Sequence, residues 1–407
     1  MSLFGVLRAP RVVLFGPGQR NALPRLAAEL GRRVFLCTDA RFHTDRRLSD
    51  LAESLRQAGM DVEIYDETLP ELPLQCIEEA GARAKRFAPD VVVAVGGGSC
   101  IDLGKLVAVR LVFEGPLADL YGEFKVPSGV PPVIAIPTTA GTGSEATPVA
   151  VLGDDARTMK VGISSPHLIP YAAICDPELT LTCPPALTAT VGADALTHAI
   201  EAFTALAREP SSDLAFDHVF VGRNSLSQML ARESIRCLAA HLERAVAEGQ
   251  DLAAREQVML GSFLAGQAFG VSGTAAAHAI QYPVGALTHT AHGVGVAVLL
   301  PFVMEYNRPA CLAEFAEIAR LFGINEAGSD EALSHRAIDA IDGLFARIGL
   351  PRTLADLGVG EADLDRICEQ SLSIERLMKN NPRPLARDSL AQLLAAAYSG
   401  NRALLRN

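Results

Sequence analysis

The sequence predicts an α/β fold in two parts: a Rossmann-like α/β domain at residues 1–185 and an all-α domain at residues 186–407. In the first part, short runs rich in Val and Ile alternate with amphipathic stretches, which is typical of a parallel sheet covered on both faces. Strand signals stop near residue 185, and helical periodicity continues from there. A chain of 407 residues is also long for one hydrophobic core, which favours two domains with a ligand cleft between them.

The individual elements follow from these runs. Buried strands are expected at 12–16, 33–39, 61–67, 90–98 and 132–139. Helix-like segments lie between them, for example at 21–31 and 48–60. Residues 146–165 are expected to form a β-hairpin whose turn is the GDDA stretch at 153–156. The second domain is expected to consist of consecutive helices, among them 234–249, 255–270, 312–323, 334–349 and 388–400.

Composition narrows the classes of function. The formal net charge is −11 and no long Lys/Arg run occurs, which argues against a nucleic acid partner. The longest apolar runs are too short to span a bilayer, and Arg8 and Arg11 interrupt the N-terminal stretch, so we expect a cytoplasmic protein without a signal peptide. Eight cysteines occur without a CxxC pair, which favours reduced thiols over disulfides or a thiolate zinc site.

A glycine-rich stretch after the fourth expected strand is the strongest nucleotide signal. In VGGGSCIDLGK (95–105), Gly96, Gly97 and Gly98 end the strand, and Ser99 is expected to cap the following helix. Bare backbone N–H groups at a helix N-terminus suit a pyrophosphate. A tight strand-to-helix turn by itself would not need three consecutive glycines, so we favour a nucleotide loop.

Two further features extend this nucleotide site. The stretch PTTAGTGSEAT follows another strand. Its hydroxyls could form a second wall of the nucleotide site, with a surface turn as the alternative; they belong to Thr138, Thr139, Thr142 and Ser144. Asp39 is the last residue of the second expected strand, 21 residues after Gly18. A carboxylate at this place typically binds the ribose hydroxyl of NAD and repels the phosphate of NADP. A simple cap at the strand end is equally compatible with the sequence.

Asp194 and His198 are four residues apart on an expected helix and therefore share one face. Such a pair is often a surface salt bridge, but the surrounding VGADALTHAIEAF is too apolar for a solvated face, and a buried polar pair needs a partner. A metal ion would supply it, with help from the histidines of AHAIQYPVGALTHTAHGVG, which are His278, His289 and His292. One carboxylate and several imidazoles suit Fe2+ or Zn2+. Spacing alone decides neither the metal nor which histidines converge.

Taken together, these motifs resemble the iron-containing (group III) alcohol dehydrogenases of the dehydroquinate synthase-like superfamily. The matching stretches cover nearly the whole chain and are, in order, GGGSCIDLGK, PTTAGTGSEAT, DPELTLTCP, GADALTHAIEAF and AAAHAIQYPVGALTHTAHGVG. The resemblance implies a NAD-binding α/β domain, a helical metal-binding and substrate domain, and a homodimer or larger assembly. It implies metal ligation by Asp194, His198, His278 and His292. His289 falls where relatives carry no ligand.

The resemblance also implies contacts to NAD and to substrate. The NAD contacts are implied at Asp39, Gly97, Gly98, Ser99, Thr138, Thr139, Thr142, Lys160 and Leu179. Phe269 and Leu377 match apolar walls of the substrate pocket, whereas Lys105 is expected to support the fold. Tyr282 stands where many relatives carry a histidine assigned to proton relay. A tyrosine, with an ordinary pKa of about 10, is a poorer proton shuttle, so we interpret Tyr282 as a proton donor or substrate contact.

The expected activity is reversible hydride transfer between a small primary alcohol and NAD, with the metal as Lewis acid. The first alternative is a short-chain hydroxyacid dehydrogenase or transhydrogenase, because transhydrogenases of the same superfamily look to share the tyrosine. The second is a dehydroquinate synthase-like lyase. Such an enzyme would need a basic pocket, and the helical half has few basic residues near its motifs. A non-catalytic metal- and nucleotide-binding protein is the third.

Overall fold

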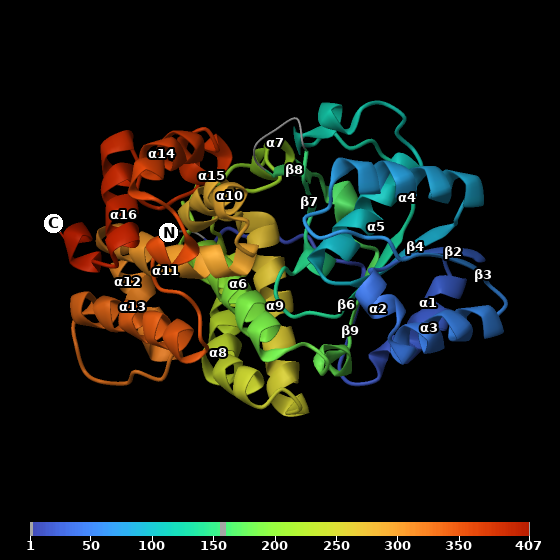
Figure 1. Ribbon diagram of the computed structural model, residues 1–407, viewed down its shortest axis with the longest axis horizontal. Coiled ribbons are helices and arrows are strands. Elements are labelled where there is room, and N and C mark those ends of the chain that lie inside the picture. Colours follow the sequence, from blue (N-terminus) through green and yellow to red (C-terminus); the bar gives the residue numbers. More distant parts are fainter. Residues whose placement is uncertain (1–2, 155–159, 407) are drawn as a thin grey trace. The chain divides into compact units, whose positions relative to one another are not determined.

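The computed structural model describes residues 3–154 and 160–406, which form two compact units. Among these residues, the α/β unit comprises 8–182 and 216–219, and the helical unit comprises 3–7, 183–215 and 220–406. Figure 1 labels the helices and strands of both units. None of the described helices is both long enough and apolar enough to cross a membrane.

The α/β unit is built on a six-stranded parallel sheet with the strand order β1-β9-β6-β4-β2-β3. Its strands are β1 (Val12–Phe15), β2 (Arg33–Cys37), β3 (Asp61–Tyr65), β4 (Val91–Gly96), β6 (Val133–Pro137) and β9 (Ala172–Cys175). The first five lie within the expected ranges, so the predicted parallel sheet is confirmed. The sequence analysis missed β9, because its AAIC segment is short and lacks the Val-rich signature of the other strands.

Helices cover both faces of this sheet (Figure 1). Successive side chains of a strand point to opposite faces. Leu36 of β2 therefore joins the core formed with α1 (Leu23–Ala28) and α3 (Arg46–Gln57), and Phe35 joins the core formed with α4 (Leu74–Phe87) and α5 (Gly98–Arg110). Burial on both faces explains why these strands are nearly continuous apolar runs.

A smaller sheet completes the α/β unit. Its strands β7 (Val149–Leu152) and β8 (Val161–Ser164) pair antiparallel, as expected for the hairpin, and β5 (Gly122–Glu123) pairs in parallel with β8. The expected GDDA turn falls partly outside the described residues, which stop at 154 and resume at 160.

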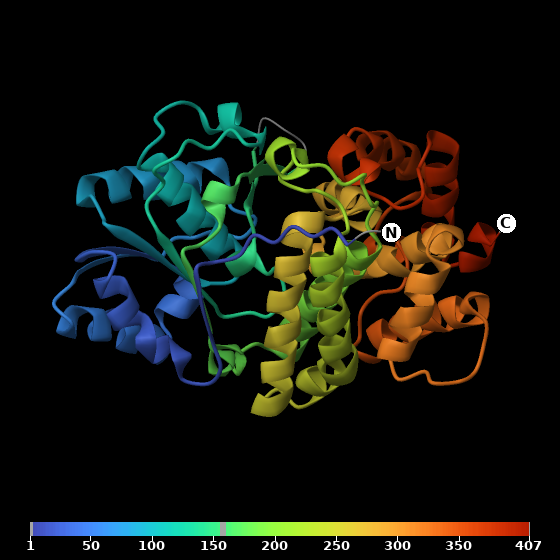
Figure 2. The same ribbon diagram turned by 180° about the vertical axis from the view of Figure 1, so that it is seen from behind.

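Consecutive helices follow, and no strand occurs after β9 in the described part of the chain. The helices are α6 (Pro185–Thr204), α7 (Leu214–Asp217), α8 (Ser225–Ala247), α9 (Leu252–Ser272), α10 (Ala276–Thr288), α11 (His292–Asn307), α12 (Leu312–Leu321), α13 (Asp330–Arg347), α14 (Leu364–Leu372), α15 (Glu375–Lys379) and α16 (Arg387–Ser399). Helix α6 packs against α8, α9 and α11, and Figure 2 shows α8 and α9 side by side. Most of α6 is therefore buried, including its polar residues.

Candidate metal centre and nucleotide loops

Helix α6 carries the first half of the candidate metal centre. The helix is 20 residues long and begins at Pro185. Proline suits this first position, because a backbone N–H there would have no partner within the helix. Asp194 and His198 therefore lie one turn apart, and both are buried. The Nε2 atom of His198 lies 3.8 Å from Oδ1 of Asp194. The predicted shared face of this pair is thus confirmed.

Helices α10 and α11 bring two further imidazoles to the same carboxylate. His278 lies in the first turn of α10, and His292 is the first residue of α11. The Nε2 atom of each lies 3.7 Å from Oδ1 of Asp194. The ligand atoms offered by Asp194, His278 and His292 all lie within 4.8 Å of one another. His198 is not part of this closest group, although it contacts the same oxygen.

The geometry and chemistry of this cluster fit a divalent cation. Oδ1 of Asp194 and Nε2 of His278 are buried and have no hydrogen-bond partner, and such atoms are costly unless something satisfies them. Separations of 3.7–3.8 Å are too long for hydrogen bonds. They are close to the roughly 3.4 Å between two ligands of a tetrahedral cation with bonds of about 2.1 Å. The three imidazoles outweigh the effect of burial and lower the pKa of Asp194, so that it is ionised.

Glu201 is a contributor that the sequence analysis missed. This buried residue of α6 accepts a hydrogen bond from Nδ1 of His278 at 2.6 Å, and it also accepts the backbone N–H groups of Ala275 and Ala277 at 2.8 Å each. Burial lowers the pKa of His278, but the charges of Glu201 and Asp194 outweigh it and raise this pKa to about 9. A sequence signal existed: Glu201 follows Asp194 by seven residues, which places it on the same helical face.

The aromatic residues around the cluster differ in their placement. Phe269 of α9 stacks on His198, with ring centroids 4.2 Å apart. Tyr282 lies one turn after His278, and its ring centroid is 6.1 Å from that of His292. Leu377 is buried in the hydrophobic core that also contains Ile280 of α10.

His289 lies apart from the cluster. It ends α10 in a left-handed conformation with φ of 56°, and it is exposed. Its backbone N–H donates to the carbonyl of Gly285, so its local role is to terminate the helix. The resemblance-based expectation that His289 is not a ligand agrees with this placement.

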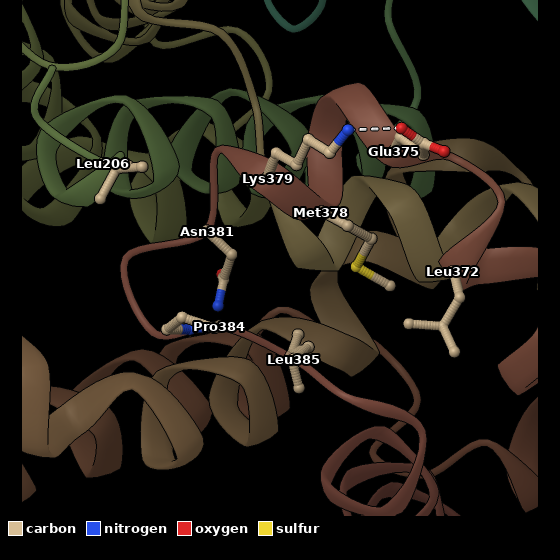
Figure 3. Close-up of a pocket in the computed structure, with 8 residues that line it drawn as sticks. All are labelled: Leu206, Leu372, Glu375, Met378, Lys379, Asn381, Pro384 and Leu385. Carbon is tan, nitrogen blue, oxygen red and sulfur yellow. Dashed lines mark hydrogen bonds and ion pairs between the residues drawn. The ribbon is translucent and has the colours of Figure 1, made fainter.

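A pocket of about 360 Å³ lies elsewhere in the helical unit (Figure 3). Its lining residues come from the end of α14, from α15 and from the segments that follow α6 and α15; they are Leu206, Leu372, Glu375, Met378, Lys379, Asn381, Pro384 and Leu385. The expected pocket-wall residues Phe269 and Leu377 are not among them, although Met378, the neighbour of Leu377, is. Two of the lining residues, Glu375 and Lys379, form an exposed ion pair (Figure 3).

The glycine loop of the α/β unit has one feature that corrects the prediction. The residue that caps α5 is Gly97, and Ser99 is already the second residue inside the helix. Ser99 is therefore not the cap, because the extended backbone that a cap requires occurs two residues earlier. A Cβ atom at Gly98 would lie 2.6 Å from Cγ2 of Thr142, so only glycine allows the threonine loop to approach this closely.

The two expected walls of the nucleotide site do lie together. The backbone N–H of Thr138 donates to the carbonyl of Gly96 at 2.9 Å, and a Cβ atom at Gly97 would lie 3.5 Å from Oγ1 of Thr139. Asp39 caps α2 (Ala40–His43), because its Oδ1 accepts the backbone N–H of Phe42 at 2.7 Å. Thus Asp39 is a helix cap two residues after β2 ends, and it lies beside the glycine loop, 3.6 Å from Sγ of Cys100.

The remaining expected cofactor residues have structural partners of their own. Lys160 pairs with Glu71 at 3.0 Å, and Leu179 is a fully buried part of the sheet core. Lys105 is fully buried and donates to the carbonyls of Thr147 and Val149 at 3.0 and 2.7 Å. This agrees with the expectation that Lys105 supports the fold, by joining α5 to the segment that leads into β7.

Adjacent glycine and threonine loops in the α/β unit, and a buried carboxylate–imidazole cluster in the helical unit, fit a metal-dependent, nucleotide-linked enzyme. A family model described as "Iron-containing alcohol dehydrogenase" matches residues 10–177, and one described as "Fe-containing alcohol dehydrogenase family, C-terminal" matches residues 188–398. The chain belongs to the iron-containing alcohol dehydrogenase family, as its motifs predicted.

Similar proteins of known activity cover the chain almost completely. It is 37% identical to long-chain-alcohol dehydrogenase 1 of Geobacillus thermodenitrificans, over 93% of this chain and 94% of that protein. It is 33% identical to the NAD-dependent methanol dehydrogenase of Bacillus methanolicus, over 95% of this chain and 98% of that protein. The crystal structure of a 1,3-propanediol oxidoreductase matches with a TM-score of 0.90 and 35% identity, covering 97% of this chain and 100% of the other.

Proposed function

We propose that this chain is a NAD-linked, divalent-metal-dependent alcohol dehydrogenase that interconverts a small primary alcohol and its aldehyde. The observation that carries the proposal is the convergence of three imidazole Nε2 atoms on one buried carboxylate oxygen, at 3.7–3.8 Å. The similar dehydrogenases act on methanol, 1,3-propanediol and long-chain alcohols according to their names, which supports an alcohol as the substrate class.

In this proposal the cation is held by Asp194, His198, His278 and His292. Fe2+ is the proposed metal because of the family, and Zn2+ suits the same ligand set. When bound, the cation supplies a Lewis acid for the alcohol oxygen, and NAD supplies the hydride acceptor. The stacking of Phe269 on His198 keeps that ring oriented and excludes water from its face.

The remaining roles belong to the loops of the α/β unit and to Tyr282. The backbone N–H groups of Gly98 and Ser99 are proposed to bind the pyrophosphate at the start of α5. The hydroxyls of Thr138, Thr139 and Thr142 would hydrogen-bond the cofactor from the facing loop, while Lys160 and Leu179 would contact its ribose and base. Tyr282, beside His292, is proposed to donate a hydrogen bond to the substrate. By family resemblance we also propose a cytoplasmic homodimer or larger homo-oligomer.

Replacing Asp39 with Gly is expected to relax the preference for NAD over NADP. The carboxylate lies beside the glycine loop and would repel a 2′-phosphate there. The variant loses the capping hydrogen bond from the backbone N–H of Phe42 to Asp39, which should cost about 1 kcal/mol of stability at most. The variant should therefore fold and can be assayed. The measurement is kcat/KM for each cofactor, and an unchanged ratio would show that Asp39 is not the selector.

The proposed function is tested by removing and restoring the metal. Protein purified without oxygen is expected to produce NADH from primary alcohols, to lose this activity with a chelator, and to regain it with Fe2+ or Zn2+. Turnover of short hydroxyacids in place of alcohols would favour the hydroxyacid dehydrogenase or transhydrogenase. Elimination chemistry without net NADH would favour the lyase. Cofactor and metal binding without any turnover would favour a non-catalytic protein.

A further inference from the structure

We propose that Glu201 holds His278 in the one tautomer that can bind a metal, and that it thereby sets the affinity of the metal centre. This inference rests on the proposed metal site. It assigns a positioning role to a residue that is not itself a ligand. The residues involved are Glu201 on α6, His278 on α10 and the backbone at the start of α10.

The hydrogen bonds of Glu201 leave its carboxylate fully engaged. One oxygen accepts Nδ1 of His278 at 2.6 Å and the N–H of Ala275 at 2.8 Å, and the other accepts the N–H of Ala277 at 2.8 Å. An ionised carboxylate only accepts hydrogen bonds. Both oxygens of Glu201 already accept backbone N–H groups, which can only donate, so the carboxylate faces Nδ1 of His278 as an acceptor too.

The proton on the imidazole is therefore placed on Nδ1. A neutral imidazole has one N–H donor and one bare nitrogen, so a proton on Nδ1 leaves the lone pair on Nε2. This Nε2 is the atom that lies 3.7 Å from Oδ1 of Asp194 and has no hydrogen-bond partner. In the other tautomer, Nε2 would carry a proton and could not bind a cation.

Glu201 also fixes the position of the helix that carries this histidine. Helix α10 begins at Ala276, and the residue at its cap, Ala275, has no side-chain oxygen to satisfy the first N–H groups. Glu201 supplies that oxygen from α6, the same helix that carries Asp194 and His198. One carboxylate thus aligns α10 with α6 and orients the imidazole between them.

The variant Glu201→Gln tests the inference. An amide has one oxygen, so it cannot accept all three hydrogen bonds, and its NH2 group opposes a donor. Partners of this kind are typically worth 10- to 100-fold in metal affinity, so the Zn2+ dissociation constant of E201Q is expected to rise by about that factor. It is measured on the intact protein by competition with a chromophoric chelator. E317Q is the matched control, because Glu317 pairs with Arg232 on the surface of the same unit.

The position of the proton on His278 gives a second readout. If Glu201 only stabilised the fold, its replacement would not change this position. With ¹⁵N-labelled histidines, two-bond ¹H–¹⁵N spectra show which ring nitrogen carries the proton, and H278A assigns the signal. At a pH well above the His278 pKa of about 9, where the imidazole is neutral, metal-free wild-type protein is expected to show His278 protonated on Nδ1, and E201Q to show a mixture of the two tautomers. A wild-type His278 protonated only on Nε2 would overturn the inference even if E201Q does not fold.

The outcomes separate this inference from the proposed function. If wild-type protein binds Zn2+ through His278 and E201Q binds it equally well, the inference fails and the metal site stands. If wild-type protein and H278A bind Zn2+ with the same low affinity, the metal site itself is wrong, and the inference falls with it.

Discussion

Replacing His278 with Ala is expected to abolish metal binding and alcohol oxidation together. His278 is one of three residues whose ligand atoms lie mutually within 4.8 Å, and its Nε2 is buried without a hydrogen-bond partner. A Lewis acid contributes several kcal/mol to transition-state stabilisation, and about 4 kcal/mol corresponds to roughly a thousandfold in rate. We therefore expect kcat to fall by about a thousandfold or more. Metal content per chain and NADH production are the measurements.

The matched control is His289→Ala, which removes an imidazole from the same stretch of sequence. His289 is exposed and lies outside the ligand group found among the described residues. Its replacement is expected to leave metal content and kcat unchanged. If H278A retained metal and full activity, or if H289A lost both, the assignment of ligands would be wrong.

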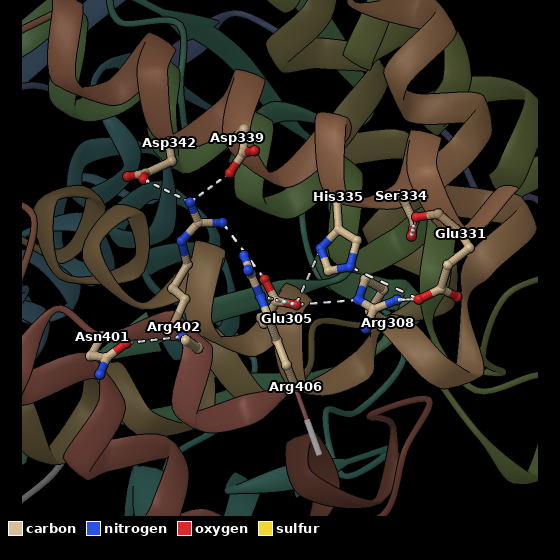
Figure 4. Close-up of polar contacts among 11 residues, drawn as sticks. Glu305, Arg308, Glu331, Ser334, His335, Asp339, Asp342, Asn401, Arg402 and Arg406 are labelled. Atoms are coloured by element: carbon tan, nitrogen blue, oxygen red, sulfur yellow. Dashed lines mark hydrogen bonds and ion pairs between the residues drawn. The ribbon is translucent and has the colours of Figure 1, made fainter. Parts of the chain in front are cut away.

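The second large effect is expected at Glu305, the centre of an ionic cluster at the far end of α11 (Figure 4). Glu305 is completely buried and is surrounded by Arg308, Arg402, Arg406 and His335, with contacts of 3.2–3.7 Å. Arg402 and Arg406 lie at the C-terminal end of the described chain. Glu305 thus ties that end to the helix whose first residue is His292.

The acidic neighbours cannot replace Glu305. Arg308 also pairs with Glu331, and Arg402 also pairs with Asp339 and Asp342, but each of these pairs lies on the outer side of the cluster (Figure 4). Without Glu305, the largely buried Arg308 loses its inner partner, and Arg402, Arg406 and His335 lose the one carboxylate that they share. Removing one partner of a buried ion pair typically costs about 3–5 kcal/mol.

Glu305→Gln is therefore expected to lower the free energy of unfolding by about 3 kcal/mol, measured in urea. The control is Glu375→Gln, which removes a carboxylate from an exposed pair with Lys379. Exposed pairs contribute little to stability because solvent screens them, so this variant should unfold almost like the wild type. Equal stabilities of the two variants would show that the cluster around Glu305 contributes little to the fold.

Local patterns predicted most of the fold because they depend on neighbours in the chain. Runs of Val and Ile marked five strands of the sheet, but Ala172–Cys175 lacks that pattern and becomes a strand only because it pairs with β1 and β6. Ser99 was expected to cap α5, and the structure gives that place to Gly97. Glycine is also a favoured N-cap residue, so the serine two residues later did not mark the start of the helix.

The sequence by itself determined the kinds of ligand and the face of one helix. Four-residue spacing places Asp194 and His198 on the same side of α6, because the helical repeat is a local property. Only the tertiary structure decided that His278 and His292 meet this pair while His289 does not. Which histidines meet depends on how α10 and α11 pack against α6. His289 itself adopts a left-handed conformation in the turn between α10 and α11. The same packing brings Glu201 to His278 across 77 residues of sequence, a contact that no local pattern encodes.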